Sequence, residues 1–241
     1  MDSPMARTLL GVWAHPDDET YLSAGLMLRL ARSGARVVCL TATRGEQGGD
    51  GSESTATLAA RRTGELAAAL GHLGVHESIV LDFPDGGCDG LDAQGVAAVA
   101  AVMADVRPDL VVTFGPDGIT GHPDHVAVSR WTTQAWQQQS PTGSLLYATT
   151  TPDFVQRHDA MHRRVGVFPP GYPQPSLPGE VLFGVDLDRA ELAVKRAALG
   201  AHASQTDSLA AHMGETAFTD WWASESFRRP RPIELAARVA A

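Results

Sequence analysis

Cysteine is scarce in this chain of 241 residues, which contains only Cys39 and Cys88. Because the two do not form a Cys-x-x-Cys pair, they provide no disulfide framework and favour a reducing compartment. Long apolar runs are also missing. The run that ends at Trp13 is too short for a signal peptide, and no segment approaches the ~20 apolar residues of a membrane span. We therefore expect a cytoplasmic protein with no membrane span.

Positive charge is in short supply as well. The chain has 19 Lys and Arg against 28 Asp and Glu, which gives a net charge of −9. This acidic balance argues against a nucleic-acid-binding protein and against a polybasic membrane-surface protein. With 44% hydrophobic and 20% charged residues the composition is otherwise ordinary. The length suits one α/β domain with a sizeable core, and a homo-oligomer is compatible with this composition.

Two similar motifs carry the chemistry that the sequence does contain. They are His15-Pro16-Asp17-Asp18 and His122-Pro123-Asp124-His125. Each follows an apolar run typical of a buried strand and precedes a segment with apolar residues at helical spacing. Open α/β sheets bind ligands at the carboxyl ends of their strands. We therefore expect both motifs at one edge of one sheet.

The spacing within each motif suits metal binding. His15 and Asp18 are three residues apart, as are His122 and His125, and this spacing puts each pair on one face of a helical turn. Two imidazoles and one carboxylate form a catalytic-type set that leaves a metal position open for water. Asp17 lies beside this set and can take a proton from metal-bound water, whose pKa zinc lowers to roughly 7. A helix-capping Asp with surface histidines is the simpler alternative, but the repetition of the motif favours a metal site.

The sequence also resembles the PIG-L/LmbE-like family of zinc-dependent N-acetylglucosaminyl deacetylases. The similarity rests mainly on Ala14–Glu19 and Gly121–His125, with support from Thr43–Gly48, Arg62, Glu65, Asp82–Gly86 and His202–Gln205. It covers about residues 8 to 230, nearly the whole chain. The two His-Pro-Asp motifs are its most specific part.

The resemblance implies metal-assisted hydrolysis that removes an acetyl group from the amide nitrogen of an N-acetylglucosamine conjugate. His15, Asp18 and His125 would hold Zn²⁺, with Fe²⁺ as the alternative ion, and Asp17 would be the general base. His122 would stabilise the oxyanion as an imidazolium, and Asp124 would orient His122 and raise its pKa.

The resemblance also implies contacts with a small-molecule sugar conjugate. Arg62 would reach its anionic or polyhydroxyl part, and Asp85 would accept hydrogen bonds from sugar hydroxyls. Many relatives carry an aromatic residue just before the second motif, whereas this chain has Ile119-Thr120. Tyr172 could replace that aromatic residue.

Three other functions remain open at this point. The chain could be an amidase for a thiol conjugate whose amide lies outside the sugar. A 2-His-1-carboxylate set also occurs in non-haem Fe(II) enzymes, although usually on the strands of a β-barrel. A non-catalytic sugar-binding protein is the third alternative, but such a protein needs no base like Asp17.

The pattern of elements predicts a Rossmann-like α/β fold, an open and mostly parallel sheet with helices on both faces. We expect strands at 9–13, 36–42, 77–81, 109–114, 144–149 and 180–186, and helices at 20–33, 58–73, 91–106, 125–137 and 187–202. The metal site would lie at the carboxyl edge of the strands. We expect a single domain over residues 1–241, with a Pro-rich segment at about 165–180 covering the site.

Overall fold

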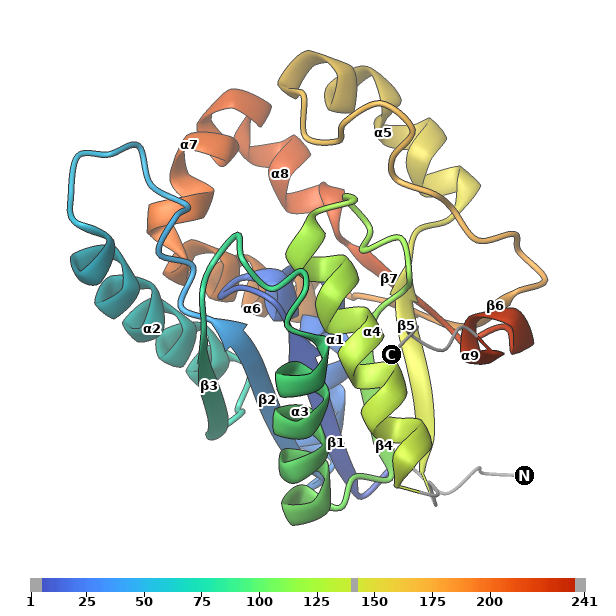
Figure 1. Ribbon diagram of the computed structural model, residues 1–241. Helices are drawn as coiled ribbons and strands as arrows, with labels where there is room; N and C mark the ends of the chain where they lie inside the picture. Colours follow the sequence, from blue (N-terminus) through green and yellow to red (C-terminus); the bar gives the residue numbers. More distant parts are fainter. Residues whose placement is uncertain (1–5, 140–142, 237–241) are drawn as a thin grey trace.

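One sheet connects the two halves of the chain. The computed structural model describes residues 6–139 and 143–236 (Figure 1). Its strands are β1 (Thr8–Trp13), β2 (Arg36–Thr43), β3 (Glu77–Phe83), β4 (Leu110–Phe114), β5 (Ser144–Thr149), β6 (Val181–Asp186) and β7 (Ser224–Arg228). Over these described residues they form a seven-stranded sheet in the order β3-β2-β1-β4-β5-β7-β6. Strands β1 to β5 are parallel, whereas β7 is antiparallel to both of its neighbours.

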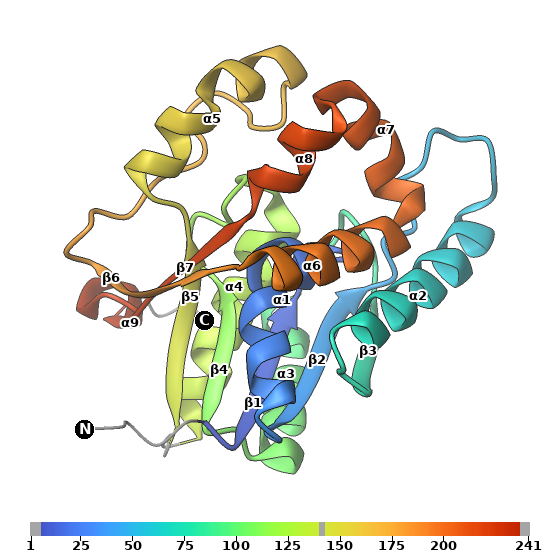
Figure 2. The ribbon, with the colours of Figure 1, turned by 180° about the vertical axis from the view of Figure 1, so that it is seen from behind.

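Helices cover both faces of this sheet. They are α1 (Asp18–Arg32), α2 (Thr55–His72), α3 (Asp92–Val106), α4 (Pro123–Gln138), α5 (Pro152–Val165), α6 (Arg189–Ala201), α7 (Ala203–Met213), α8 (Glu215–Trp221) and α9 (Pro232–Ala236). Helices α3 and α4 pack together on one face (Figure 1), and α1, α6 and α2 cover the other (Figure 2). Helices α5, α7 and α8 lie above the carboxyl ends of the strands. Among the described helices none is both long and apolar enough to cross a bilayer.

The local sequence explains why these elements form where they do. Because helices cover both faces, the central parallel strands are nearly continuous apolar runs, and Leu9, Leu10, Val12 and Trp13 of β1 are all buried. Side-chain caps start the helices α2, α4, α5 and α6: Asp188, for example, forms a capping box with Glu191 at the start of α6. The predicted α/β architecture is confirmed.

The structure also contains elements that the sequence analysis did not predict. These are α5, α7, α8, α9 and the strand β7, all in the part of the chain after residue 150. Helix α5 is mostly polar and buries only Phe154 and His162, so it contributes few apolar residues by which the sequence could reveal it. Strand β7 has five residues, and its place between β5 and β6 depends on pairing with distant segments.

A buried ion pair joins α1 to β7 and α6. Lys195 Nζ lies 2.7 Å from Glu225 Oε1, and both side chains are almost completely buried. The Lys195 ammonium also donates to the Tyr21 carbonyl, while Glu225 accepts from the backbone N–H groups of Gly25 and Leu26. The pair thus binds backbone groups of α1 at Tyr21, Gly25 and Leu26.

We predict that Glu225→Ala lowers the free energy of unfolding by about 3–5 kcal/mol, because it leaves a buried ammonium without its partner. Chemical denaturation measures this change. The matched control is Glu215→Ala. Glu215 pairs with Arg196, the residue after Lys195, and the Glu215 side chain is largely exposed. The control should have a far smaller effect, and equal losses in the two variants would contradict the prediction.

Candidate metal centre and active site

The two His-Pro-Asp motifs meet where the order of the sheet reverses. Strand β1 has β2 on one side and β4 on the other, and Leu9 is in register with Leu110. The loop after β1 places His15 just before α1, and the loop after β4 places His122 at the N-cap of α4. This is the position at which doubly wound sheets bind their ligands.

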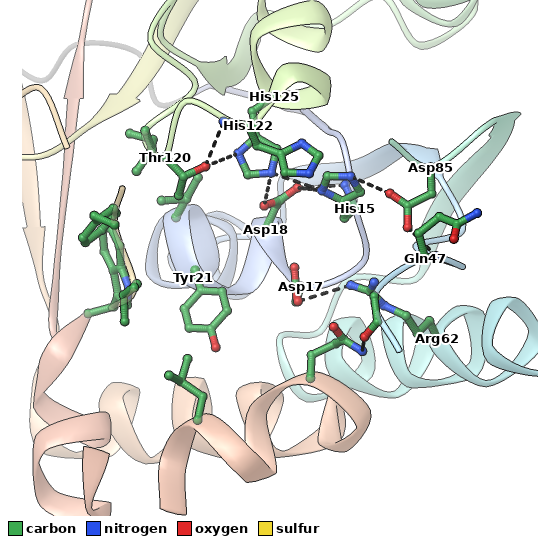
Figure 3. A pocket seen from close by; sticks show the side chains of 18 of the residues that line it. His15, Asp17, Asp18, Tyr21, Gln47, Arg62, Asp85, Thr120, His122 and His125 are labelled. Atoms are coloured by element: carbon green, nitrogen blue, oxygen red, sulfur yellow. Dashed lines mark hydrogen bonds and ion pairs between the residues drawn. The ribbon is translucent and has the colours of Figure 1, made fainter. Parts of the chain in front are cut away.

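Three donor groups converge there at metal-ligand spacing (Figure 3). His15 Nδ1 lies 3.1 Å from His125 Nε2. The Asp18 carboxylate faces both rings, with Oδ2 3.6 Å from His15 Nδ1 and Oδ1 3.3 Å from His125 Nε2. Ligand atoms at ~2.0–2.1 Å from a tetrahedral zinc ion lie about 3.3 Å from one another. The spacing of His15, Asp18 and His125 therefore fits one divalent ion.

Hydrogen bonds on the far sides of these two rings support the same arrangement. His125 Nδ1 donates to the Gly118 carbonyl at 2.9 Å. His15 Nε2 lies 3.1 Å from Asp124 Oδ2 and 3.0 Å from Asp85 Oδ1. Metal-binding histidines usually donate their other ring N–H to a carbonyl or carboxylate in this way, which leaves the facing nitrogen as the ligand.

His122 differs from His15 and His125, because its second ring nitrogen accepts a hydrogen bond instead of donating one. Its ring lies close to that of His15, with the ring centroids 4.8 Å apart, and a ligand group of His15, His122 and His125 is also within reach of one ion. However, His122 Nδ1 accepts the Asp124 backbone N–H at 3.2 Å and so caps α4. A neutral His122 must then carry its proton on Nε2, which makes this nitrogen a hydrogen-bond donor and not a metal ligand.

The Asp124 carboxylate contacts a different partner from the one we predicted. It was expected to orient His122, but it faces His15 Nε2 and accepts from the backbone N–H groups of Gly86 and Cys88. Burial and then His15 lower the pKa of His122 below its usual value, and they outweigh Asp124, which raises this pKa as we expected. The carboxylate has other partners for a geometric reason, because the Asp124 backbone N–H faces His122 while the side chain points toward His15 and the loop after β3.

The environment of His15 attracts positive charge. Burial lowers the pKa of this ring, but hydrogen bonds to Asp124, Asp18 and Asp85 outweigh burial and raise it well above its usual range. On Nδ1, which faces Asp18, a metal cation takes the place of a proton, so metal binding should displace a proton from His15.

Asp17 occupies the N-cap position of α1 but does not act as a cap. Its φ is 121°, and its side chain makes no capping hydrogen bond. Such a backbone conformation is strained for a residue other than glycine, typically by about 1–3 kcal/mol. Burial raises the pKa of the Asp17 carboxyl to about 7, although Arg62 opposes this shift. The carboxylate borders the cavity and lies 3.3 Å from Arg62.

Arg62 and Asp85 both border the cavity, but each is also engaged within the protein. The Arg62 guanidinium donates to the carbonyls of Gly45 at 2.8 Å and Pro16 at 2.6 Å. Asp85 Oδ2 accepts the Gln47 backbone N–H at 2.7 Å. These contacts hold the loops around the site, and direct binding of substrate by Arg62 and Asp85 stays a prediction.

The cavity over these residues has a volume of about 390 Å³ and two unlike sides. Its polar side contains the predicted site residues except Asp124, which is fully buried behind His15. The other side is apolar and was not predicted as a set: Tyr21, Leu22, Val167, Phe168, Leu209, Trp221 and Trp222. Val167 and Phe168 belong to the segment that we expected to cover the site.

Tyr172 of the same Pro-rich segment lies over the second motif. A side chain at Gly121 would come within 2.4 Å of the Tyr172 ring, and Gly121 has a φ of 73°. Only glycine therefore fits beneath this ring, immediately before His122.

Comparison with known proteins identifies the family. Residues 10–136, just over half of the chain, match the model of the PIG-L family, described as GlcNAc-PI de-N-acetylase. This chain belongs to the PIG-L family. The match confirms the family and the N-deacetylase class that the two motifs predicted.

Full-length relatives agree with this assignment. The chain is 36% identical to a 1D-myo-inositol 2-acetamido-2-deoxy-alpha-D-glucopyranoside deacetylase from Kineococcus radiotolerans, over 85% of this chain and 70% of that protein. It is 37% identical to the protein of the same name from Rhodococcus opacus, over 83% of this chain and 82% of that one. The N,N'-diacetylchitobiose deacetylase of Pyrococcus horikoshii shares the fold, with a TM-score of 0.66, 21% identity and coverage of 93% and 84%.

We predict one divalent ion per chain, held by His15, Asp18 and His125. His125→Ala should lose this ion, whereas His122→Ala, a matched change in the same motif, should keep it because Nε2 of that ring carries a proton. Metal analysis of the purified variants measures both. His15, Asp85 and Asp124 form a second potential ligand group, but it uses the His15 nitrogen that should carry a proton. Two ions per chain, or an ion lost from the His122 variant, would contradict this assignment.

Proposed function

We propose that this protein removes the acetyl group from a glucosaminyl-inositol conjugate, with Zn²⁺ as its metal. The observation that carries this proposal is the convergence of His15, Asp18 and His125 at metal-ligand spacing with the free Asp17 carboxylate beside them. A hydrolase needs such a base next to its metal, whereas a protein that only binds sugar does not.

His15, Asp18 and His125 would hold Zn²⁺, which when bound would lower the pKa of a water molecule and polarise the amide carbonyl. Asp17 takes the proton of the attacking water and returns it to the amide nitrogen, so that acetate and a free amine leave. The neighbouring Arg62 favours the ionised form of Asp17. This side-chain pair thus keeps a buried carboxylate available as a base.

His122 is suited to stabilise the oxygen of the amide carbonyl as it gains negative charge. Because its Nδ1 accepts the Asp124 N–H, its Nε2–H is available as a donor on the cavity side. Neutral His122 can therefore fill this role without becoming an imidazolium. Removing one such donor typically costs ~2.7–4 kcal/mol of transition-state stabilisation. Asp124 acts on the other side of the site, where it orients His15.

The substrate is proposed from the relatives and from the cavity. The curated relatives are named for a glucosaminyl-inositol. The polar side of the cavity, with Gln47, Arg62 and Asp85, suits hydroxyl groups, and the indole rings of Trp221 and Trp222 offer flat surfaces to a sugar ring. We propose that one domain carries the whole activity. A cytoplasmic location agrees with the two free cysteines.

We predict that Asp17→Asn keeps its metal and loses roughly 10²–10⁴-fold in turnover, the usual contribution of a general base. The matched variant Asp18→Asn should lose metal and activity together. Activity of the unmodified enzyme should fall as the pH drops below about 7, since Asp17 must be ionised and its pKa is raised to about 7. Metal analysis and a pH–rate profile measure these effects. If Asp17→Asn loses its metal and keeps full turnover per remaining ion, the two roles are reversed.

We predict faster amine release from the acetylated glucosaminyl-inositol than from N,N'-diacetylchitobiose, a thiol conjugate with its amide outside the sugar, or an N-acetylated peptide. The measurement is the rate of free-amine formation with each compound at equal metal occupancy, with metal-free protein as the control. Faster release from the thiol conjugate would make the protein an amidase of that kind. Binding of the sugar without amine release would favour the non-catalytic alternative, and activity only with Fe²⁺ would overturn the choice of zinc.

A further inference from the structure

The strained Asp17 backbone is held by a neighbouring pair of buried residues. We infer that Glu19 and His202 are positioning residues, which keep the Asp17 carboxylate turned toward the cavity. The inference rests on the proposed function, because it concerns the residue to which that function assigns the role of general base. The observations that carry it are the contacts of the Glu19 carboxylate with the Asp17 backbone N–H and with His202.

Asp17 is at the N-cap position of α1, where an Asp carboxylate normally accepts backbone hydrogen bonds from the helix. An N-cap Asp accepts hydrogen bonds from the N–H groups of the first helical turn with its side chain. In this structure the Asp17 backbone carbonyl accepts from Thr20 and Tyr21, but its carboxylate caps nothing. The φ of 121° turns the side chain toward Arg62 and the cavity, as Figure 3 shows.

Glu19 supplies the contact that fixes this conformation. Glu19 Oε2 accepts the Asp17 backbone N–H at 3.0 Å. Its other oxygen, Oε1, accepts from the Thr20 hydroxyl at 2.5 Å and from His202 Nε2 at 2.9 Å. The Glu19 side chain is completely buried, so each of these donors is needed to offset the loss of water. A carboxylate held in this way cannot move without leaving a buried charge unsatisfied.

His202 holds Glu19 from a different part of the chain. It lies at the junction between α6 and α7, and its side chain is 1% exposed. The contacts with Glu19 raise the pKa of His202 against the effect of burial, which favours a charged and strong hydrogen bond. Helix α7 continues from this junction to the cavity wall at Leu209. The pair therefore connects the conformation of Asp17 to the segment that closes the cavity.

A double-mutant cycle tests this inference on the metal-loaded full chain. Glu19→Ala should keep the metal and the KM while kcat falls by roughly 10–10³-fold, part of the contribution of the base. In the Asp17→Asn background the same change should have almost no further effect, because residues that act through one group are not additive. Glu19→Gln should restore part of the rate, since its amide oxygen can still accept the Asp17 N–H.

A second measurement does not depend on activity. In metal-free protein the Asp17 amide should exchange its hydrogen slowly, and Glu19→Ala should remove this protection at Asp17 while the interior of α1 stays protected.

If Glu19→Ala does not fold, His202→Phe takes its place in both tests. The matched control is Thr206→Val, which removes a buried hydroxyl from the same helix junction, where it bonds the carbonyls of Leu199 and His202 without touching Glu19. It should change stability but not kcat.

The outcomes separate this inference from the proposed function. If Asp17→Asn has full activity, the assignment of the general base is wrong, and the positioning role fails with it. If Asp17→Asn is impaired but Glu19→Ala lowers kcat by the same factor in both backgrounds, only the inference is wrong, and Glu19 has a purely structural role. Unchanged kcat in both Glu19→Ala and His202→Phe, or unchanged exchange of the Asp17 amide, would also overturn it.

Discussion

The parallel pairing of β1 with β4 is the constraint on which the site depends. It places the ends of two strands side by side although His15 and His125 are 110 residues apart in sequence. The Asp109 carboxylate reinforces this register because it accepts the backbone N–H groups of Arg7 and Thr8 at the start of β1. The register delivers both motifs to the edge of the sheet with their donors already at metal-ligand spacing. Without this pairing each motif is only a helix start with a histidine.

Burial then gives similar side chains different roles. The carboxylates of Asp17, Asp18 and Asp124 line or border one site, yet each has different partners. Asp17 lies beside the Arg62 guanidinium, and Asp18 faces the His15 and His125 rings. Asp124 contacts the other nitrogen of His15 and two backbone N–H groups. In water these carboxylates would be nearly equivalent. In the protein, burial raises the pKa of Asp17 to about 7, while the pKa of Asp18, despite its own burial, is lowered to about 2 by His125 and His15. Environment, rather than residue type, separates the proposed base Asp17 from the proposed metal ligand Asp18.

The part of the chain after residue 150 completes the site in a less direct way. Helices α7 and α8 and the Pro-rich segment form the apolar side of the cavity, and β7 joins the sheet through antiparallel pairing. The same region contacts α1 through two buried pairs, Lys195 with Glu225 and His202 with Glu19. These pairs connect the start and the middle of α1 to the part of the chain after residue 150.

The sequence by itself determined the features that depend on local spacing. Apolar runs and helical periodicity placed β1 to β6, and the repeated His-Pro-Asp motif indicated the metal site and the family. Only the tertiary structure decided features that depend on contacts between distant segments: the partner of Asp124, the tautomer of His122, the position of β7 and the side of the cavity formed by Trp221 and Trp222. The physical reason is that periodicity records which face of an element is buried. A hydrogen bond across 109 residues, such as that of His15 with Asp124, leaves no periodic signal in the sequence.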